Sequence, residues 1–134
     1  MIRCCLLACL PLLVGCGSGS GRVGVQGSVS YKDAPLKQGT ISFEPMGETR
    51  AANPNYSAGS LIKDGTYNIE AEKGLLPGQY SVKISSTSGG APGDTLPGTF
   101  PLAKEVLPEK YNSQTKLTAE ITATNPNKKD FPLD

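Results

Sequence analysis

Carboxylates are the side chains of this 134-residue chain that could carry acid–base chemistry, because the sequence contains no histidine. Nucleophiles activated by an imidazole base, and the usual histidine-containing zinc or iron sites, are therefore excluded. Glu70 with Glu72 and Glu105 with Glu109 are close enough in sequence to act as acid and base or to bind calcium. A solvated strand face explains the first pair equally well, and no spaced Asp-x-Asp-x-Asp loop is present. We assign no catalytic residue and no metal ligand.

Two long segments, residues 45–60 and 86–101, lack a repeating apolar pattern and are predicted to be irregular. Loops longer than ~12 to 15 residues are usually functional or mobile. The second is rich in Gly, Pro, Ser and Thr, so a tolerated flexible insertion explains it at least as well. The first holds side chains suited to recognition, and Tyr56 could stack on a sugar or a partner. The candidate recognition residues are Arg50, Asn53, Asn55 and Tyr56.

The first sixteen residues, MIRCCLLACLPLLVGC, have the layout of a secretory signal. Arg3 precedes an apolar run from Leu6 to Val14, and small Gly15 follows that run. The run is too short to cross a bilayer, because a spanning helix needs ~20 apolar residues. We therefore predict export rather than a transmembrane helix.

The ending Leu13-Val14-Gly15-Cys16 resembles the lipobox of bacterial lipoproteins. The resemblance implies cleavage between Gly15 and Cys16, so that residues 1–15 are the signal peptide. It also implies a diacylglycerol on the Cys16 thiol and acylation of the new amino group, which makes the membrane a partner. Two or three chains are enough for stable anchoring, because each buried methylene contributes ~0.8 kcal/mol. By the same resemblance, Gly17 is not the aspartate that retains many lipoproteins in the inner membrane, so an outer-membrane location is expected.

Lipidation and cleavage would leave no cysteine pair, because Cys4, Cys5 and Cys9 lie in the signal peptide. Residues 16–22 then form a tether, since Gly and Ser alternate from Gly17 to Gly21 and such segments behave as flexible coils. Residues 23–134 are long enough for one domain. The net charge of +1 and the lack of a basic run argue against a nucleic-acid partner.

From Val23 onward the apolar residues recur with a period of two, which indicates half-buried strands. Asp64-Gly65 is a favoured pair for a type I′ hairpin, and Pro77-Gly78 suits a type II turn. Asp33-Ala34-Pro35 is a third predicted reversal. These signals predict an all-β domain, an antiparallel β-sandwich of about seven strands. The predicted strands lie within residues 23–31, 40–44, 67–72, 79–85, 117–124 and 131–133, with a further strand before the Asp64-Gly65 turn.

Three segments carry a family resemblance: VQGSVSYKDAPLKQGTISFEP (25–45), IKDGTYNIE (62–70) and LLPGQYSVKI (75–84). They resemble the transthyretin-like, carboxypeptidase-regulatory-like domains, which have a prealbumin- or Ig-like sandwich fold. The tail LPEKYNSQTKLTAEI (107–121) resembles the end of small lipoproteins of this fold from planctomycete-type bacteria. The resemblance implies an accessory or interaction module. Enzymes of related folds depend on histidines that this chain lacks.

We therefore expect a membrane-anchored, non-catalytic interaction or structural module of the cell envelope. Its expected partner is an envelope protein or a polysaccharide. Binding of a small ligand or carbohydrate is the alternative, and a carboxylate-dependent enzyme is a third hypothesis.

Overall fold

The computed structural model describes residues 21–88 and 104–134. The predicted signal peptide (1–15), Cys16 and the tether up to Ser20 lie outside the described residues. So does most of the predicted loop 86–101. The described residues belong to the predicted domain, apart from the last two residues of the tether.

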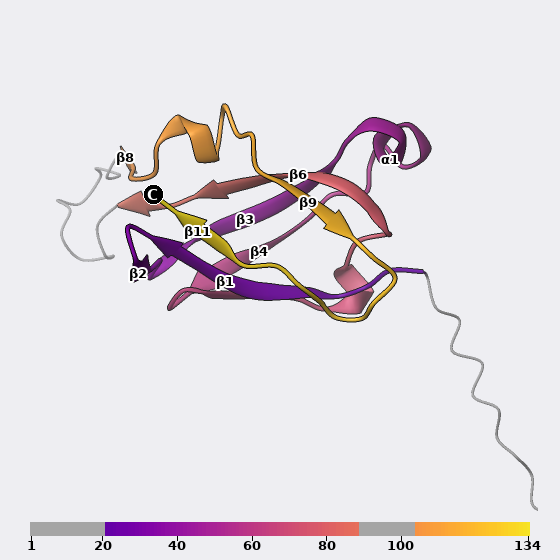
Figure 1. Ribbon diagram of the computed structural model, residues 1–134, viewed down its shortest axis with the longest axis horizontal. Helices are drawn as coiled ribbons and strands as arrows, with labels where there is room; N and C mark the ends of the chain where they lie inside the picture. Colours follow the sequence, from indigo (N-terminus) through magenta and orange to yellow (C-terminus); the bar gives the residue numbers. More distant parts are fainter. Residues whose placement is uncertain (1–20, 89–103) are drawn as a thin grey trace, which may run out of the picture.

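The regular structure of the described chain consists mainly of short strands (Figure 1). One α-helix and two 3₁₀ turns interrupt them: α1 (Gly47–Ala52), η1 (Ala71–Lys73) and η2 (Glu109–Tyr111). The strands are β1 (Val25–Tyr31), β2 (Ala34–Pro35), β3 (Gln38–Pro45), β4 (Ala58–Lys63), β5 (Thr66–Ile69), β6 (Gly78–Ser85), β7 (Thr87–Ser88), β8 (Lys104–Glu105), β9 (Thr118–Ile121), β10 (Asn127–Lys128) and β11 (Phe131–Leu133).

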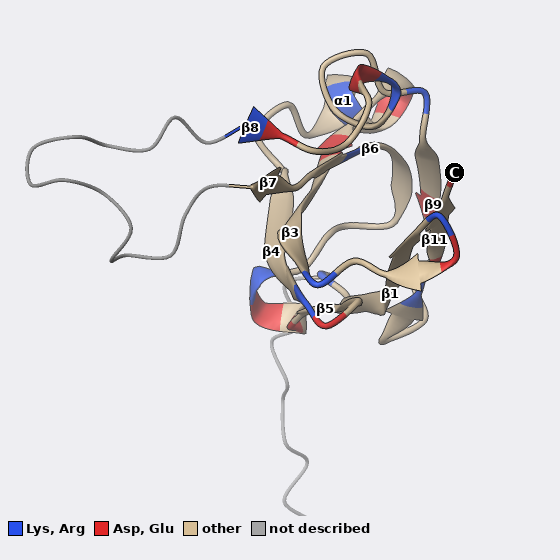
Figure 2. Ribbon diagram, turned by 90° about the vertical axis from the view of Figure 1, so that its left-hand side faces the viewer, with Lys and Arg blue, Asp and Glu red and all other residues tan. Residues whose placement is uncertain are grey.

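Nine of the strands form one sheet with the order β10-β1-β5-β4-β3-β6-β9, while β2 and β11 also pair with β1. Neighbouring strands are antiparallel, except that β10 and β11 run parallel to β1. The sheet curls round the core, so that β3 and β4 face β9 and β11 across it (Figure 2). The predicted all-β, antiparallel fold is confirmed. The β4–β5 hairpin joins the expected layers into one continuous curled sheet.

Side chains that alternate along the strands fill a single core, as the period of two predicts. Every second residue of β6 is buried, for example, and the polar residues between them face outward. The ten most deeply buried side chains come from five strands and one loop. They are Val25, Val29, Ile41, Phe43, Ile62, Leu75, Tyr80, Val82, Ile84 and Ile121.

Two of the three predicted reversals are tight turns whose central residues have positive φ. Asp64 and Gly65 have φ of 50° and 77°, as a type I′ hairpin requires. The first reversal lies one residue earlier than predicted, because Lys32 and Asp33 have the positive φ values and Ala34 already pairs with Tyr31. Gly78 has a φ of 154°, an extended glycine conformation that starts β6 rather than the third residue of a type II turn.

The prediction of an irregular segment over residues 45–60 is wrong. It contains α1, and β4 begins at Ala58. No residue of α1 is buried, so the helix has no apolar stripe that the sequence could reveal. The helix is held instead by polar contacts to β6, where the Gln79 N–H donates to the Thr49 hydroxyl at 2.9 Å.

Two predicted strands are shorter than their alternating patterns. β5 ends at Ile69, where the chain turns into η1, and β9 ends at Ile121, so Ala123 is exposed. In both places the alternating pattern continues for three residues beyond the end of the strand. Periodicity alone therefore overestimates strand length.

Candidate functional site

The predicted recognition residues do not converge on one surface hollow. Arg50 lies in the last turn of α1, and Asn53 ends the helix by donating its N–H to the Thr49 carbonyl at 2.9 Å. Asn55 is exposed in the turn that follows. None of these side chains lines the depression on the outer face of β1, β4 and β5.

Tyr56 has a role within the protein itself. The Arg22 guanidinium lies 4.7 Å from the centre of the Tyr56 ring, and its Nη1 approaches the Glu72 carbonyl at 3.5 Å. Next to it, Val23 and Leu75 exchange two backbone hydrogen bonds of 2.8 and 3.1 Å. A cation–π contact at an exposed site is worth about 0.5–1 kcal/mol. Tyr56 thus helps to fasten the chain where it enters the domain.

The first predicted carboxylate pair does not share a strand face. Glu70 follows the end of β5, and Glu72 lies within η1. Both are exposed. The hypothesis that they line one polar face of a strand is therefore wrong.

Glu105 is a structural carboxylate. It accepts hydrogen bonds from the Ser85 hydroxyl, from the Ser86 N–H at 2.8 Å and from the Leu107 N–H at 3.0 Å. Burial raises the pKa of the Glu105 carboxyl, but the donated hydrogen bonds lower it by more, so the pKa lies below its ordinary value. With its oxygens engaged by donors, Glu105 is poorly placed to act as a base. Glu109, its predicted partner, accepts from Gln114 instead.

Replacing Glu105 by glutamine is expected to lower the free energy of unfolding by about 1–3 kcal/mol at pH 7, because charge-assisted hydrogen bonds are lost. A pKa that is lower in the folded state contributes stability above the unfolded-state pKa, and this contribution disappears as pH falls through the folded-state pKa. The difference between wild type and variant should therefore shrink below pH ~4. Urea unfolding at pH 7 and at lower pH measures it. Glu120→Gln, at an exposed position of β9, is the control, and equal losses in both variants would contradict the assignment.

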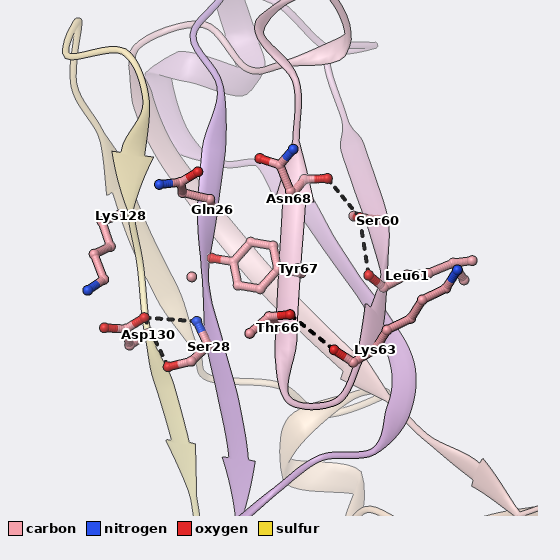
Figure 3. A pocket seen from close by; sticks show the side chains of 11 residues that line it. Gln26, Ser28, Ser60, Leu61, Lys63, Thr66, Tyr67, Asn68, Lys128 and Asp130 are labelled. Carbon is pink, nitrogen blue, oxygen red and sulfur yellow. Dashed lines mark hydrogen bonds between the residues drawn. The ribbon is translucent and has the colours of Figure 1, made fainter.

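A broad depression lies on the outer face of β1, β4 and β5, and we call it the β1–β5 groove (Figure 3). It is open to solvent and has a volume of about 770 Å³. β4 and β5 form a ladder pair only at Lys63 and Thr66, next to the turn. Beyond it the Ser60 hydroxyl, rather than a backbone N–H, donates to the Asn68 carbonyl at 2.9 Å. The groove is lined by Gln26, Gly27, Ser28, Ser60, Leu61, Lys63, Thr66, Tyr67, Asn68, Lys128 and Asp130.

Polar side chains cross the groove in two rows. In the first row, Gln26 pairs with Lys128 on one side and with Asn68 on the other. In the second row, Ser28 pairs with Thr66 in the ladder, and its N–H and hydroxyl both donate to Asp130, at 2.8 and 3.0 Å. The rows are two residues apart along the strands, which corresponds to about 7 Å, and neighbouring strands lie about 4.8 Å apart.

The two rows differ in what they offer a ligand. No hydrogen bond among the groove residues uses the side-chain amide of Gln26 or Asn68 (Figure 3). In the second row, hydrogen bonds from the Ser28 N–H and hydroxyl lower the pKa of the Asp130 carboxyl, so it is ionised at neutral pH. The first row therefore supplies uncommitted donors and acceptors, and the second supplies mainly acceptors.

The period of two is consistent with polar, outward positions for Gln26, Ser28 and Asn68, but it does not mark them as a site. Alternating polar residues are expected on any solvent-facing sheet. The pairing of Gln26 with Asn68 and Lys128 depends on register between segments that are far apart in the sequence. No local signal could have revealed it.

No protein-family model, no curated protein and no solved structure matches this chain. The candidate site therefore stands on its geometry alone. Within residues 21–88 and 104–134, no three His, Cys, Asp or Glu side chains gather as metal ligands would. Among the same residues, no helix has the length and apolar character needed to cross a membrane. The predicted cleavage and lipidation site, Gly15 and Cys16, lies outside the described residues.

Proposed function

We propose that the protein is a lipoprotein of the cell envelope, anchored through lipid on Cys16, whose β domain is a non-catalytic module acting through surface contacts. The observation that carries the proposal is the signal layout ending in Leu13-Val14-Gly15-Cys16, followed after a few residues by a folded domain. A tether of that length keeps the domain close to the surface that holds the lipid.

The way in which the chain enters the domain agrees with this proposal. Gly21 lies at the end of the domain that carries α1 and η1, whereas the turns after β1 and β4 lie at the opposite end (Figure 1). Contacts of Arg22 with Tyr56 and of Val23 with Leu75 fasten the chain at this end. The outer face of β1 and β5 is left open to a partner. In an anchored domain the α1 and η1 end would therefore be nearest the membrane. The β1–β5 groove would lie on the side of the domain and would not face the lipid.

The proposed location is the outer membrane, because Gly17 follows the cysteine. The proposed partner is an envelope protein or a polysaccharide. The engagement of Glu105 by donors and the lack of histidine favour contact over catalysis.

We also propose that the domain is transthyretin-like. The segments that carry the resemblance form β1 to β3, the β4–β5 hairpin and β6. These elements make up the continuous centre of the sheet. An experimental structure of the protein, compared with transthyretin-like domains, tests this assignment.

Replacing Cys16 by alanine is expected to move the protein from the membrane fraction to the soluble fraction, or to block its processing, because the thiol that receives the lipid is absent. Fractionation and intact mass spectrometry of the full-length protein measure both outcomes. Cys9→Ala, a cysteine in the apolar run, is the matched control and should remain processed and membrane-bound. A Cys16→Ala protein that behaves like the Cys9→Ala control, or an unmodified Cys16 thiol in the wild type, would refute the anchor.

Contacts between the domain and an envelope partner are tested by crosslinking in membranes that contain the full-length protein. A photoreactive amino acid at Leu61, which is 61% exposed at the groove rim, should crosslink to an envelope protein or polysaccharide. The same group at Val106, which is exposed but does not line the groove, is the control. Crosslinks from neither position would remove the support for a contact function.

A further inference from the structure

We propose that the β1–β5 groove binds a neutral, polyhydroxylated ligand, a saccharide, across strands β10, β1 and β5. The inference rests on the proposed function, because it names the partner class of that surface. Its basis is the two-row arrangement of Lys128, Gln26 and Asn68 beside Asp130, Ser28 and Thr66.

The chemistry of the rows matches hydroxyl groups, each of which donates and accepts. The amides of Gln26 and Asn68 can do both, and the Lys128 ammonium can donate. The hydroxyls of Ser28 and Thr66 already donate, to Asp130 and to the Lys63 carbonyl, so their oxygens are left to accept. A hydroxylated ligand lying across the rows would find donors on one side and acceptors on the other.

The dimensions of the arrangement also suit a saccharide. Rows about 7 Å apart and neighbours about 4.8 Å apart cover an area comparable with one or two sugar rings. The volume of about 770 Å³ lies within the usual range of ligand sites. Leu61 at the rim offers an apolar contact for the C–H face of a ring.

The charges of the groove favour a neutral ligand. Lys128 stands at the end of the first row and Asp130 at the corresponding end of the second row, while Lys63 lies on β4 at the opposite edge (Figure 3). An acidic polymer would meet the Asp130 carboxylate, and a cationic one would meet Lys63 and Lys128. A neutral ligand can bind both by hydrogen bonds.

The test is affinity electrophoresis of the detergent-solubilised full-length protein in native gels that contain one polysaccharide each. The neutral probes are amylose, hydroxyethylcellulose and dextran, and the anionic comparator is alginate. We expect at least one neutral polymer to retard the wild type. The double variant Gln26→Ala/Asn68→Ala should lose affinity by at least about tenfold, because two ligand hydrogen bonds are removed.

The matched control is Gln79→Ala/Asn55→Ala, which removes one Gln and one Asn that are exposed outside the groove. It should bind like the wild type, and equal melting temperatures of the two double variants would show that both are folded. If the groove variant is unfolded, the single variants Gln26→Ser and Asn68→Ser replace it.

Three results would overturn the saccharide site. They are no retardation of the wild type by any neutral polymer, equal retardation of wild type and groove variant, and retardation by alginate alone. A crosslink from Leu61 to a protein, with no neutral polymer bound, would overturn the saccharide ligand and leave the envelope-contact function standing. Loss of membrane attachment would bear only on the lipid anchor. Failure of the saccharide site and failure of the anchor are therefore distinguishable.

Discussion

Replacing Phe43 by alanine is expected to lower the free energy of unfolding by about 3–5 kcal/mol, the range for a large aromatic side chain deleted from a core. Phe43 is fully buried in β3. Its ring centre lies 6.2 Å from that of Tyr67 and 6.3 Å from that of Phe131, so it joins a central strand to β5 and to β11. A loss of this size is a large share of the 5–15 kcal/mol that stabilises a typical domain.

Urea unfolding followed by circular dichroism measures the loss. Phe43→Leu should cost less than the alanine variant, because it leaves a smaller cavity. Leu61→Ala should change stability by less than about 0.5 kcal/mol, because its side chain is 61% exposed. If Phe43→Ala proved as mild as Leu61→Ala, the aromatic cluster could not be the centre of the core.

Gly27→Ala is expected to destabilise the protein by about 3 kcal/mol, at the upper end of the usual cost of overpacking. A Cβ atom at position 27 would lie 1.8 Å from the Lys129 carbonyl oxygen and 2.6 Å from its carbon. These are backbone atoms between β10 and β11, so no side-chain rotation relieves the clash. The Tyr67 hydroxyl donates to the same carbonyl at 2.6 Å, and displacement of Lys129 would break that hydrogen bond.

The expected signature of Gly27→Ala is local as well as global. Hydrogen exchange should accelerate in β10 and β11, because both pair with β1 on either side of the contact. Gly47→Ala is the control: its φ of 56° is strained for alanine, but no atom lies within 4 Å of an added Cβ. It should cost about 1 kcal/mol and leave exchange in β10 and β11 unchanged. If hydrogen exchange in β10 and β11 were similar in the two variants, the packing of these strands against β1 would not require a glycine at position 27.

The groove proposal and the anchor proposal use different parts of the chain. The anchor depends on the residues up to Cys16, and the groove depends on side chains brought together by β1, β4, β5 and the β10–β11 segment. The contact of Arg22 with Tyr56 connects the two, because it holds the chain at the end of the domain that carries α1 and η1.

Much of the domain could be predicted from local sequence. The period of two along β1, β3, β5 and β6 identifies which side chains face the core, because successive residues of a strand point to opposite faces. Asp64-Gly65 predicts its hairpin because both residues tolerate positive φ. The lack of histidine excludes whole classes of chemistry, since no fold can supply an absent side chain.

Tertiary structure alone decided which polar residues become neighbours. Gln26 and Lys128 are about a hundred residues apart, and their parallel pairing depends on Gly27 leaving room for the Lys129 backbone. The position of α1 and the pairing of Arg22 with Tyr56 likewise depend on contacts between distant segments. Periodicity is a local property of the chain, whereas register and closure arise from the packing of the whole core. The sequence by itself therefore determined the faces of the strands, and only the folded sheet assembled the groove.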